Sequence, residues 1–295
     1  MNPSINCNEN GLGAALGQLS GHKVLVFGGS GLIGQALTPK INCLAPSSKD
    51  CDVRDFTAVN SLIKQERPTL VINLAGESNP ANCGLQASYE LNVNSVTNIC
   101  YSLASYCKGA KLFQAGSINQ ILSPASDYSR QKIKAESVAN SYSGVLDVVN
   151  ARLCTVEGEA RSGFVVSDMV KWAKAYLATG KGFKMNDMGA RKWMLDRDTA
   201  ANCIIEHLAT GGTGNFYFGP AVSLSIDEIF CEICYQLGLS VVKNGKSWVD
   251  VESGRIIATS VAYSNLPTPD FGARACPEAA KCNLSRVINS IILSS

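Results

Sequence analysis

The chain of 295 residues has little net charge, few histidines and no long apolar run. Its 26 Lys and Arg against 24 Asp and Glu leave a net charge of +2, which gives no electrostatic basis for binding nucleic acid or an anionic membrane. No stretch approaches the roughly 20 apolar residues of a membrane-spanning helix. The N-terminus lacks the basic start and apolar stretch of a secretory signal. We therefore expect a cytoplasmic protein with neither a nucleic-acid nor a membrane partner.

Clusters of metal-ligating residues are also missing from the sequence. His22 and His207 are isolated, so we expect neither to be a ligand or a catalytic group. The twelve cysteines lie in segments such as "ANCII" and "VTNICYSL", where a free thiol behaves as a small hydrophobic side chain. Cys231 and Cys234 have Cys-x-x-Cys spacing but neither a second pair nor a nearby histidine. We expect reduced, packed cysteines and no metal site.

The chain does contain apolar runs that alternate with amphipathic segments. This alternation predicts an α/β fold, a Rossmann-like doubly wound parallel sheet whose ligands bind at the carboxyl ends of the strands. The expected strands are 23–28, 41–46, 69–76, 111–116 and 146–153, and the expected helices are 31–40, 55–66 with Asp55 as N-cap, 86–107 and 128–142.

Beyond about residue 155 the apolar runs and amphipathic segments no longer alternate regularly. We expect helices at 163–179 and 197–209, a strand at 214–219, and a helix at 226–238 that begins with a Ser225/Glu228 capping box. The predicted organisation is an N-terminal extension at 1–21, a dinucleotide-binding domain at 22–155, and a smaller mixed substrate-binding lobe at 156–295, partly interleaved with the first domain.

Three glycines, Gly28, Gly31 and Gly34, follow the first apolar run in "VFGGSGLIGQAL". Such glycines can be turn chemistry alone, but here a strand precedes them and a helix follows. In that context the first allows a tight turn, the second lets backbone approach a pyrophosphate, and the third permits close helix–strand packing. The sequence therefore predicts a dinucleotide site, with backbone contacts also from Ser30, Leu32 and Ile33.

The loop after the second expected strand reads "LAPSSKD". An NAD site usually carries an acidic residue there to accept the ribose 2′-hydroxyl. The hydroxyls and cation of Ser47, Ser48 and Lys49 instead suit a 2′-phosphate, so NADP(H) is favoured over NAD(H). Asp50 keeps NAD(H) open, and a plain solvated loop is the other alternative.

Tyr128 and Lys132 are four residues apart at the start of an expected helix, so both project from one face. An ammonium beside a phenol lowers the pKa of the phenol, which lets Tyr exchange a proton with a carbonyl. Ser117, at the end of the preceding strand, could polarise the same carbonyl. We predict a Ser117/Tyr128/Lys132 catalytic set, although the Tyr–Lys spacing alone also occurs in surface pairs.

The glycine turn, strand-end serine and Tyr-x-x-x-Lys together resemble the extended branch of the short-chain dehydrogenase/reductase superfamily, the NAD-dependent epimerase/dehydratase type. The segments "DCDVRD", "VINLAG", "LNVNSVTN", "RKWMLDRDTA" and "ARACPEAAKCNLSRV" are similar to further motifs of that family. Within the branch, the length and the passage "LAPSSKDCDVRD" look most like dTDP-dehydrorhamnose reductase and GDP-fucose synthase, which reduce a 4-keto sugar with NADPH. The resemblance covers about residues 22–290.

The resemblance assigns roles to further residues. It implies that helices 86–107 and 128–142 pair two chains into a homodimer, and that Lys132 also holds the ribose. It implies cofactor contacts by Asp52, Val53, Ala75, Gly76, Asn92 and Leu153, with Asn92 in a structural or proton-relay role. It implies nucleotide-sugar contacts by Arg191 and Arg274.

Some features depart from the family pattern. Only 11 positions separate Ser117 from Tyr128, "CTVEG" stands where the family has Asn-x-Tyr-Gly, and "GSINQ" lacks the acid pair of the sugar dehydratases. The leading hypothesis is an NADP(H)-dependent reductase of a nucleotide-linked sugar. One alternative is an epimerase with a retained cofactor and a further acid–base residue, for which Cys154 and Glu77 are candidates. Another is a non-catalytic regulatory subunit that binds nucleotide.

Overall fold

The computed structural model describes residues 11–158, 164–220, 223–262, 284–286, 288–289 and 291–293. The chain divides into two compact units. The first unit comprises residues 1–154 and 197–219, and the second comprises residues 155–196 and 220–295. The chain therefore leaves the first unit, returns to it for 197–219, and leaves it again.

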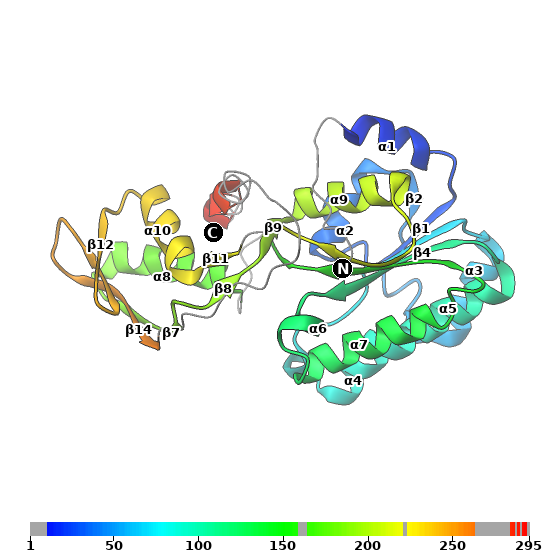
Figure 1. Ribbon diagram of the computed structural model, residues 1–295, viewed down its shortest axis with the longest axis horizontal. Helices are drawn as coiled ribbons and strands as arrows, with labels where there is room; N and C mark the ends of the chain where they lie inside the picture. Colours follow the sequence, from blue (N-terminus) through cyan, green and yellow to red (C-terminus); the bar gives the residue numbers. More distant parts are fainter. Residues whose placement is uncertain are drawn as a thin grey trace. The chain divides into compact units, whose positions relative to one another are not determined.

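The first unit is built on a six-stranded parallel sheet in the order β10-β5-β4-β3-β1-β2 (Figure 1). This confirms the predicted Rossmann-like doubly wound architecture. The strand order reverses between β1 and β3, and ligands of such sheets bind at that switch point. The strands are β1 (Val24–Phe27), β2 (Cys43–Leu44), β3 (Leu70–Asn73), β4 (Lys111–Ser117), β5 (Asp147–Leu153) and β10 (Gly214–Phe218).

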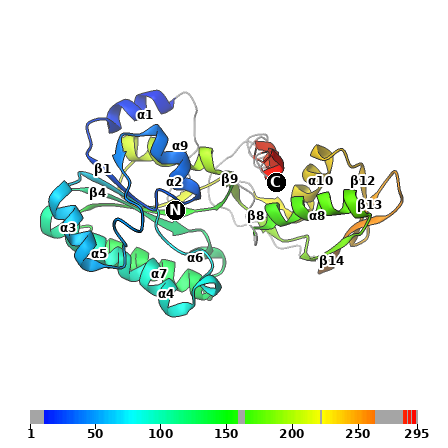
Figure 2. The same ribbon diagram turned by 180° about the vertical axis from the view of Figure 1, so that it is seen from behind.

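Helices cover both faces of this sheet (Figures 1 and 2). One face is covered by α3 (Phe56–Glu66), α5 (Ser95–Tyr106) and α7 (Asp127–Asn140), whose apolar side chains share one core with the strands. The opposite face is covered by α1 (Leu12–Leu19), α2 (Leu32–Leu37) and α9 (Arg197–Thr210), with α1 and α2 both contacting α9. The short helices are α4 (Leu85–Tyr89) and α6 (Asn119–Leu122).

The helix expected at 86–107 is not uniform. A π-helical segment, Glu90–Asn94, separates α4 from α5. Such segments are rare and concentrate at functional sites, where they re-aim a side chain. Here the segment carries Asn92, which is buried.

Two helix starts follow directly from side-chain capping. The Asp55 carboxylate accepts hydrogen bonds from the N–H groups of Thr57 and Ala58 at 2.8 and 3.2 Å. Ser225 accepts from the Glu228 N–H, and the Glu228 carboxylate accepts from the Ser225 N–H at 2.7 Å. Both N-caps are as predicted.

The second unit holds a four-stranded mixed sheet in the order β12-β13-β14-β7, with only β14 and β7 parallel. Helices α8 (Val165–Thr179) and α10 (Ile226–Gln236) contribute to a core that includes Phe230, Trp248 and Ile257. Two short strand pairs accompany it. The strands are β6 (Thr155–Glu157), β7 (Phe183–Asp187), β8 (Arg191–Lys192), β9 (Met194–Asp196), β11 (Leu224–Ser225), β12 (Val241–Asn244), β13 (Ser247–Asp250) and β14 (Ile256–Ala262).

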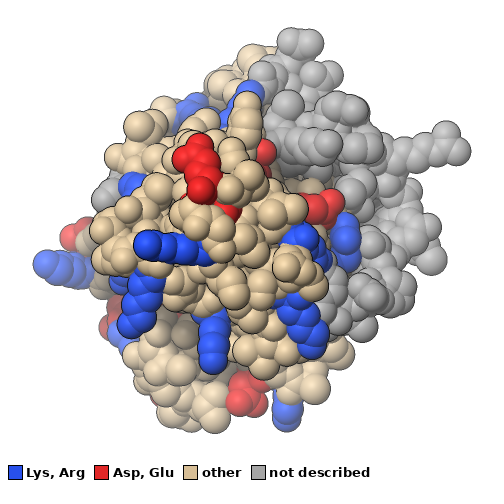
Figure 3. All heavy atoms as spheres, turned by 90° about the vertical axis from the view of Figure 1, so that its left-hand side faces the viewer, with Lys and Arg blue, Asp and Glu red and all other residues tan. Residues whose placement is uncertain are grey.

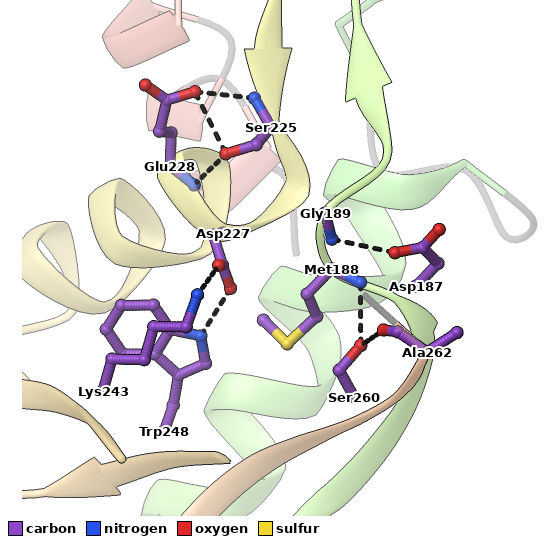
Figure 4. A network of polar contacts seen from close by, with 10 residues as sticks. All are labelled: Asp187, Met188, Gly189, Ser225, Asp227, Glu228, Lys243, Trp248, Ser260 and Ala262. Atoms are coloured by element: carbon purple, nitrogen blue, oxygen red, sulfur yellow. Dashed lines mark hydrogen bonds and ion pairs between the residues drawn. The ribbon is translucent and has the colours of Figure 1, made fainter. Parts of the chain in front are cut away.

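Polar contacts in the second unit tie its elements together (Figure 4). The buried Asp227 carboxylate at the start of α10 accepts from Lys243 Nζ at 2.5 Å and from Trp248 Nε1 at 2.7 Å. The Ser260 hydroxyl accepts from the Met188 N–H at 2.9 Å and donates to the Ala262 carbonyl. These bonds join α10 to β12 and β13, and join the residue after β7 to β14.

Basic side chains are spread over the surface of the second unit and do not gather in one stripe (Figure 3). The exposed ones include Lys171, Lys181, Lys184, Lys246 and Arg255. This arrangement is that of a solvated surface.

One cysteine departs from the expected free thiols. Cys203 in α9 is disulfide-bonded, whereas the other eight described cysteines are thiols outside any disulfide. Sequence spacing carries no information on such pairing, so the expectation of a wholly reduced chain is wrong at this position. No helix in the described ranges is long and apolar enough to cross a bilayer.

Candidate active site

The glycine turn lies at the sheet's switch point, against the end of β3. Gly28 has φ +82°, and a Cβ there would lie 2.6 Å from the Ala75 nitrogen. A Cβ on Gly34 would lie 2.3 Å from the Gly28 carbonyl oxygen. Gly31 begins α2 without a side-chain cap, and Leu32 and Ile33 form the first turn of that helix. The turn admits no side chains at Gly28 and Gly34, and the uncapped first turn suits an anion.

The loop after β2 closes on itself. Ser47 Oγ donates to Asp50 at 2.6 Å, and this hydrogen bond is the main cause of the lowered pKa of Asp50. Ser48 and Lys49 are exposed at the tip of the loop, as is Ser30 in the glycine turn. The carboxylate of Asp50 therefore accepts a hydrogen bond from Ser47 within the same loop, whereas the side chains of Ser48 and Lys49 are exposed to solvent.

Asp52, expected as a cofactor contact, is paired with Arg54. The guanidinium contacts both carboxylate oxygens, with Nη2 2.6 Å from Oδ2, and this bond lowers the pKa of Asp52. Val53 is buried in the core. Arg54 is not among the residues predicted for the site, although a cation two residues after an acid is a sequence signal for such a pair.

The segment after β3 is pinned by one buried amide. Asn92 accepts from the Glu77 N–H and donates to the Glu77 carbonyl, both at 2.9 Å, and it also donates to Gln131 of α7 at 2.8 Å. A Cβ on Gly76 would lie 2.8 Å from Asn92 Oδ1 and 3.1 Å from Lys132 Nζ. Asn92 thus holds Gly76 and Glu77 against the helix that carries Tyr128 and Lys132.

The structure brings Ser117, Tyr128 and Lys132 together. Ser117 is buried at the end of β4, and its side chain hydrogen-bonds the Tyr128 phenol. Lys132 is only 5% exposed, donates to the Ala115 carbonyl at 3.1 Å, and lies 5.9 Å from the centre of the Tyr128 ring. Two hydroxyl groups and an ammonium therefore meet at the carboxyl end of the sheet.

The electrostatics of this set correct one expectation. Burial raises the pKa of Tyr128, the hydrogen bond with Ser117 lowers it, and the charge of Glu77 raises it further. Burial also lowers the pKa of Lys132 to about 8. The net lowering of the Tyr128 pKa that the neighbouring Lys132 predicts is not found, because burial has the largest effect on this phenol.

Of the remaining predicted residues, Leu153 is the register partner of Ser117 in the β4–β5 pair. Leu153 is buried at the end of β5, where its carbonyl accepts from the Ile118 N–H at 2.8 Å. Arg191, in the second unit, donates from Nε to the Ser223 hydroxyl at 2.7 Å and from Nη2 to the Ser223 carbonyl. Arg274 lies outside the described residues. Cys154, a candidate acid–base group, is buried.

The two histidines have structural contacts. His22 Nδ1 is 3.1 Å from the Thr69 hydroxyl, and His207 Nε2 is 3.1 Å from the Gly212 carbonyl. Burial lowers the pKa of His207, which favours the neutral ring. Among the residues that the structure describes, no group of three His, Cys, Asp or Glu side chains could hold a metal ion.

Comparison with solved structures finds the same fold in nucleotide-binding proteins. RMD from Pseudomonas aeruginosa, complexed with NADPH, has a TM-score of 0.71 at 14% identity, covering 92% of this chain and 98% of that one. The dTDP-4-dehydrorhamnose reductase of Bacillus anthracis str. Ames, in complex with NADP, has 0.68 at 15%, covering 91% and 98%. WbmG from Bordetella bronchiseptica, with NAD and UDP, has 0.65 at 17%, covering 91% and 94%.

A curated relative matches over a short stretch. The "Probable GDP-L-fucose synthase" of Drosophila melanogaster is 43% identical over 61 residues, which are 18% of this chain and 19% of that protein.

The family described as "NAD dependent epimerase/dehydratase family" matches residues 24–217, the part of the chain that contains the glycine turn and the Ser117, Tyr128 and Lys132 cluster. This confirms the resemblance read from the motifs: the chain belongs to the NAD-dependent epimerase/dehydratase family.

Proposed function

We propose that the protein is an NADP(H)-dependent oxidoreductase that reduces a keto group of a nucleotide-linked sugar. The observation that carries the proposal is the hydrogen-bonded pair of Ser117, at the end of β4, and Tyr128, on α7, with Lys132 beside it. The glycine turn follows β1 at the switch point of the same sheet. A carbonyl oxygen held by the two hydroxyls would meet both a hydrogen-bond donor and a proton source.

The proposed reaction turns a ketone into an alcohol. The carbonyl carbon needs a two-electron donor, which NADPH supplies when bound. Tyr128 gives its proton to the carbonyl oxygen as charge develops there, and Ser117 stabilises that charge by donating a hydrogen bond. Lys132 favours the phenolate that Tyr128 becomes, because its ammonium is close by.

The proton on Tyr128 is consistent with this role. The ordinary pKa of a tyrosine is about 10, and burial and the Glu77 charge raise the pKa of Tyr128. The phenol therefore carries the proton that the proposed reduction transfers to the carbonyl oxygen.

Three features support NADP(H) over NAD(H). Ser48 and Lys49 are exposed where an acid would bind the ribose of NAD. Asp50 is held by Ser47, and Asp52 is neutralised by Arg54. Both carboxylates therefore already accept hydrogen bonds from their neighbours, and Lys49 offers a cation, which suits a 2′-phosphate.

The substrate class is proposed from the named relatives, which include a dTDP-4-dehydrorhamnose reductase, a probable GDP-L-fucose synthase and a protein crystallised with UDP. Arg191 and Arg274 stay our proposed contacts for the substrate diphosphate.

We also propose a homodimer formed through α5 and α7. Tyr101 on α5 and Ile133 on α7 are 52% and 41% exposed, an apolar surface that a second chain would cover. Light scattering on the purified protein tests this proposal.

The experiment for the main proposal is NADPH consumption with dTDP- and GDP-linked 4-keto-6-deoxy sugars, with Tyr128→Phe as the control. We expect turnover of at least one sugar by the wild type and almost none by the variant, with NADPH affinity unchanged. Tight NADPH binding without turnover of any sugar would support the regulatory-subunit alternative. Turnover unaffected by Tyr128→Phe would refute the mechanism.

An epimerase is the second candidate, and Glu77 is the observation that favours it. Its carboxylate accepts from the Asn79 N–H at 2.8 Å and from the Asn82 amide at 3.1 Å, and its charge reaches Tyr128. A fixed carboxylate there could remove a proton from the carbon beside the carbonyl. Exchange of that hydrogen with deuterated solvent, lost in Glu77→Gln, would identify the epimerase.

A further inference from the structure

A buried glutamine, Gln120 in α6, links the proposed catalytic serine to the helix that carries Tyr128. Its Oε1 accepts from the Ser117 N–H at 2.7 Å, and its Nε2 donates to Glu136 Oε2 at 2.8 Å. The side chain is 7% exposed. A Cβ on Gly116 would lie 2.5 Å from Gln120 Oε1, so the glycine leaves the space that this bond needs.

Glu136 anchors the other end of this link. It follows Lys132 by four residues and Tyr128 by eight, so α7 presents all three on one face. Its carboxylate accepts from Arg152 Nε at 2.9 Å and Nη2 at 2.6 Å, and from the Asn215 amide at 3.1 Å. The carboxylate is thereby fixed between α7, β5 and β10.

The orientation of the Gln120 amide follows from its neighbours. The Ser117 N–H can only donate, and the ionised Glu136 carboxylate can only accept. An amide is the one side chain of this size that satisfies both partners at neutral pH. An apolar side chain would satisfy neither, and a carboxylate would confront Glu136.

We propose that Gln120 is a positioning residue for Ser117. It holds the serine in place beside Tyr128 by joining the Ser117 backbone to Glu136 of α7. The inference rests on the proposed function, because its consequence is the geometry of the two hydroxyls that hold the carbonyl. Gln120 itself contacts no reacting atom; it acts through the backbone of Ser117.

The decisive variant is Gln120→Glu. The new carboxylate still accepts from the Ser117 N–H, but it faces Glu136 and the two can coexist only by sharing a proton. We expect near-normal kcat at low pH and a loss of roughly 10- to 100-fold as the shared proton is removed. KM and NADPH affinity stay near the wild-type values. The double variant Gln120→Glu/Glu136→Gln restores one amide and one carboxylate, and should flatten the pH profile again.

The matched control is Gln65→Glu on the exposed face of α3. Gln65 Nε2 donates to Glu66 at 2.9 Å, the same amide-to-carboxylate contact without a link to Ser117. Its pH profile should stay that of the wild type. A Gln120→Glu enzyme with a wild-type pH profile, or a loss that Glu136→Gln does not relieve, would overturn the proposal.

A second measurement does not depend on turnover. In Gln120→Met, which keeps the side-chain length but has only a weakly accepting thioether sulfur, the Ser117 amide should exchange its hydrogen faster than in the wild type. The Ser117 amide NMR shift in Gln120→Glu should titrate with the carboxyl pair. If the wild type reduces no sugar, the proposed function fails while these readouts still test the link. If the shift does not titrate, the link itself fails.

Discussion

The two units use buried polar side chains for different ends. In the first unit three of them converge on one place, where Asn92, Gln120 and Gln131 position the segments after β3 and β4 near Tyr128. In the second unit they fasten neighbouring elements in separate places, as Asp227 does for Trp248. Convergence on a few reacting groups marks a site, whereas dispersed contacts mark a scaffold.

The largest expected effect contrasts one tyrosine from each unit. Tyr128→Phe should lower kcat by roughly 100- to 10,000-fold, because a proton donor is lost, while unfolding changes little. Tyr176 in α8 hydrogen-bonds Asp250 at 3.2 Å and Ser253 at 3.1 Å. Tyr176→Phe should leave kcat unchanged and cost about 1 kcal/mol in the free energy of unfolding. Equal kcat losses in the two variants would break the comparison.

The next effect contrasts two buried ionisable groups, Glu157 and Lys132, by how each makes the free energy of unfolding depend on pH. Glu157 in β6 is 1% exposed, and burial raises its pKa from 4.5 to about 8, with Lys192 lowering and Asp168 raising it. The pKa of Glu157 is higher in the folded chain than in the unfolded chain. Its contribution to the free energy of unfolding is therefore fully present below about pH 4.5 and is lost as the pH rises towards 8. Over that pH interval, the free energy of unfolding of the wild type, measured with urea, should fall by roughly 3–5 kcal/mol relative to that of Glu157→Gln.

Lys132 should show the opposite slope. Its pKa falls from 10.5 to about 8 on folding, so the folded chain binds fewer protons between these values. The free energy of unfolding should rise by roughly 3 kcal/mol from about pH 8 to about pH 10.5 relative to Lys132→Met. If the free energy of unfolding changed with pH in the same direction for both residues, burial would not be the cause of both pKa shifts.

A third contrast uses two glycines where backbone approaches closely. A Cβ on Gly34 would lie 2.3 Å from the carbonyl oxygen of Gly28. A Cβ on Gly182 would lie 2.3 Å from the carbonyl oxygen of Ile256. Each alanine variant should lose roughly 1–3 kcal/mol in stability, but only Gly34→Ala should also lose NADPH affinity in a fluorescence titration. Gly17→Ala in α1, where a Cβ would meet nothing within 4 Å, is the control and should not destabilise.

The smallest contrast concerns the helix caps. Asp55→Ala and Ser225→Ala should each cost about 1 kcal/mol in thermal unfolding, because each leaves first-turn N–H groups without their acceptor. Here the two units should behave alike. A much larger loss for Ser225→Ala would show that the capping box also holds Arg191, whose Nη2 lies 3.8 Å from Glu228.

Local signals made much of this structure predictable. Apolar runs set the strands, Asp55 and Ser225 set two helix starts, and the positions of Gly28, Gly31 and Gly34 set the turn. The spacing of Tyr128 and Lys132 sufficed to bring them onto one face of α7, since helical periodicity alone fixes that relation.

Other features depend on contacts that spacing does not encode. Asn92 meets Glu77, and Gln120 meets Glu136, only after helices pack against strand ends. The raised pKa of Tyr128 follows from burial, which no local pattern measures. Glu77 was a candidate from its place near a strand end, but its effect on the Tyr128 pKa depends on how the sheet and α7 pack.

The order in which the chain is made gives β10 a further significance. This strand forms the edge of the six-stranded sheet, next to β5, yet residues 155–196 of the other unit are synthesised before it. Until residue 218 emerges, β5 is an open edge able to pair with another chain, and Glu136 lacks its Asn215 partner. A nascent chain that stalls after residue 154 therefore holds Ser117, Tyr128 and Lys132 but has an aggregation-prone sheet edge.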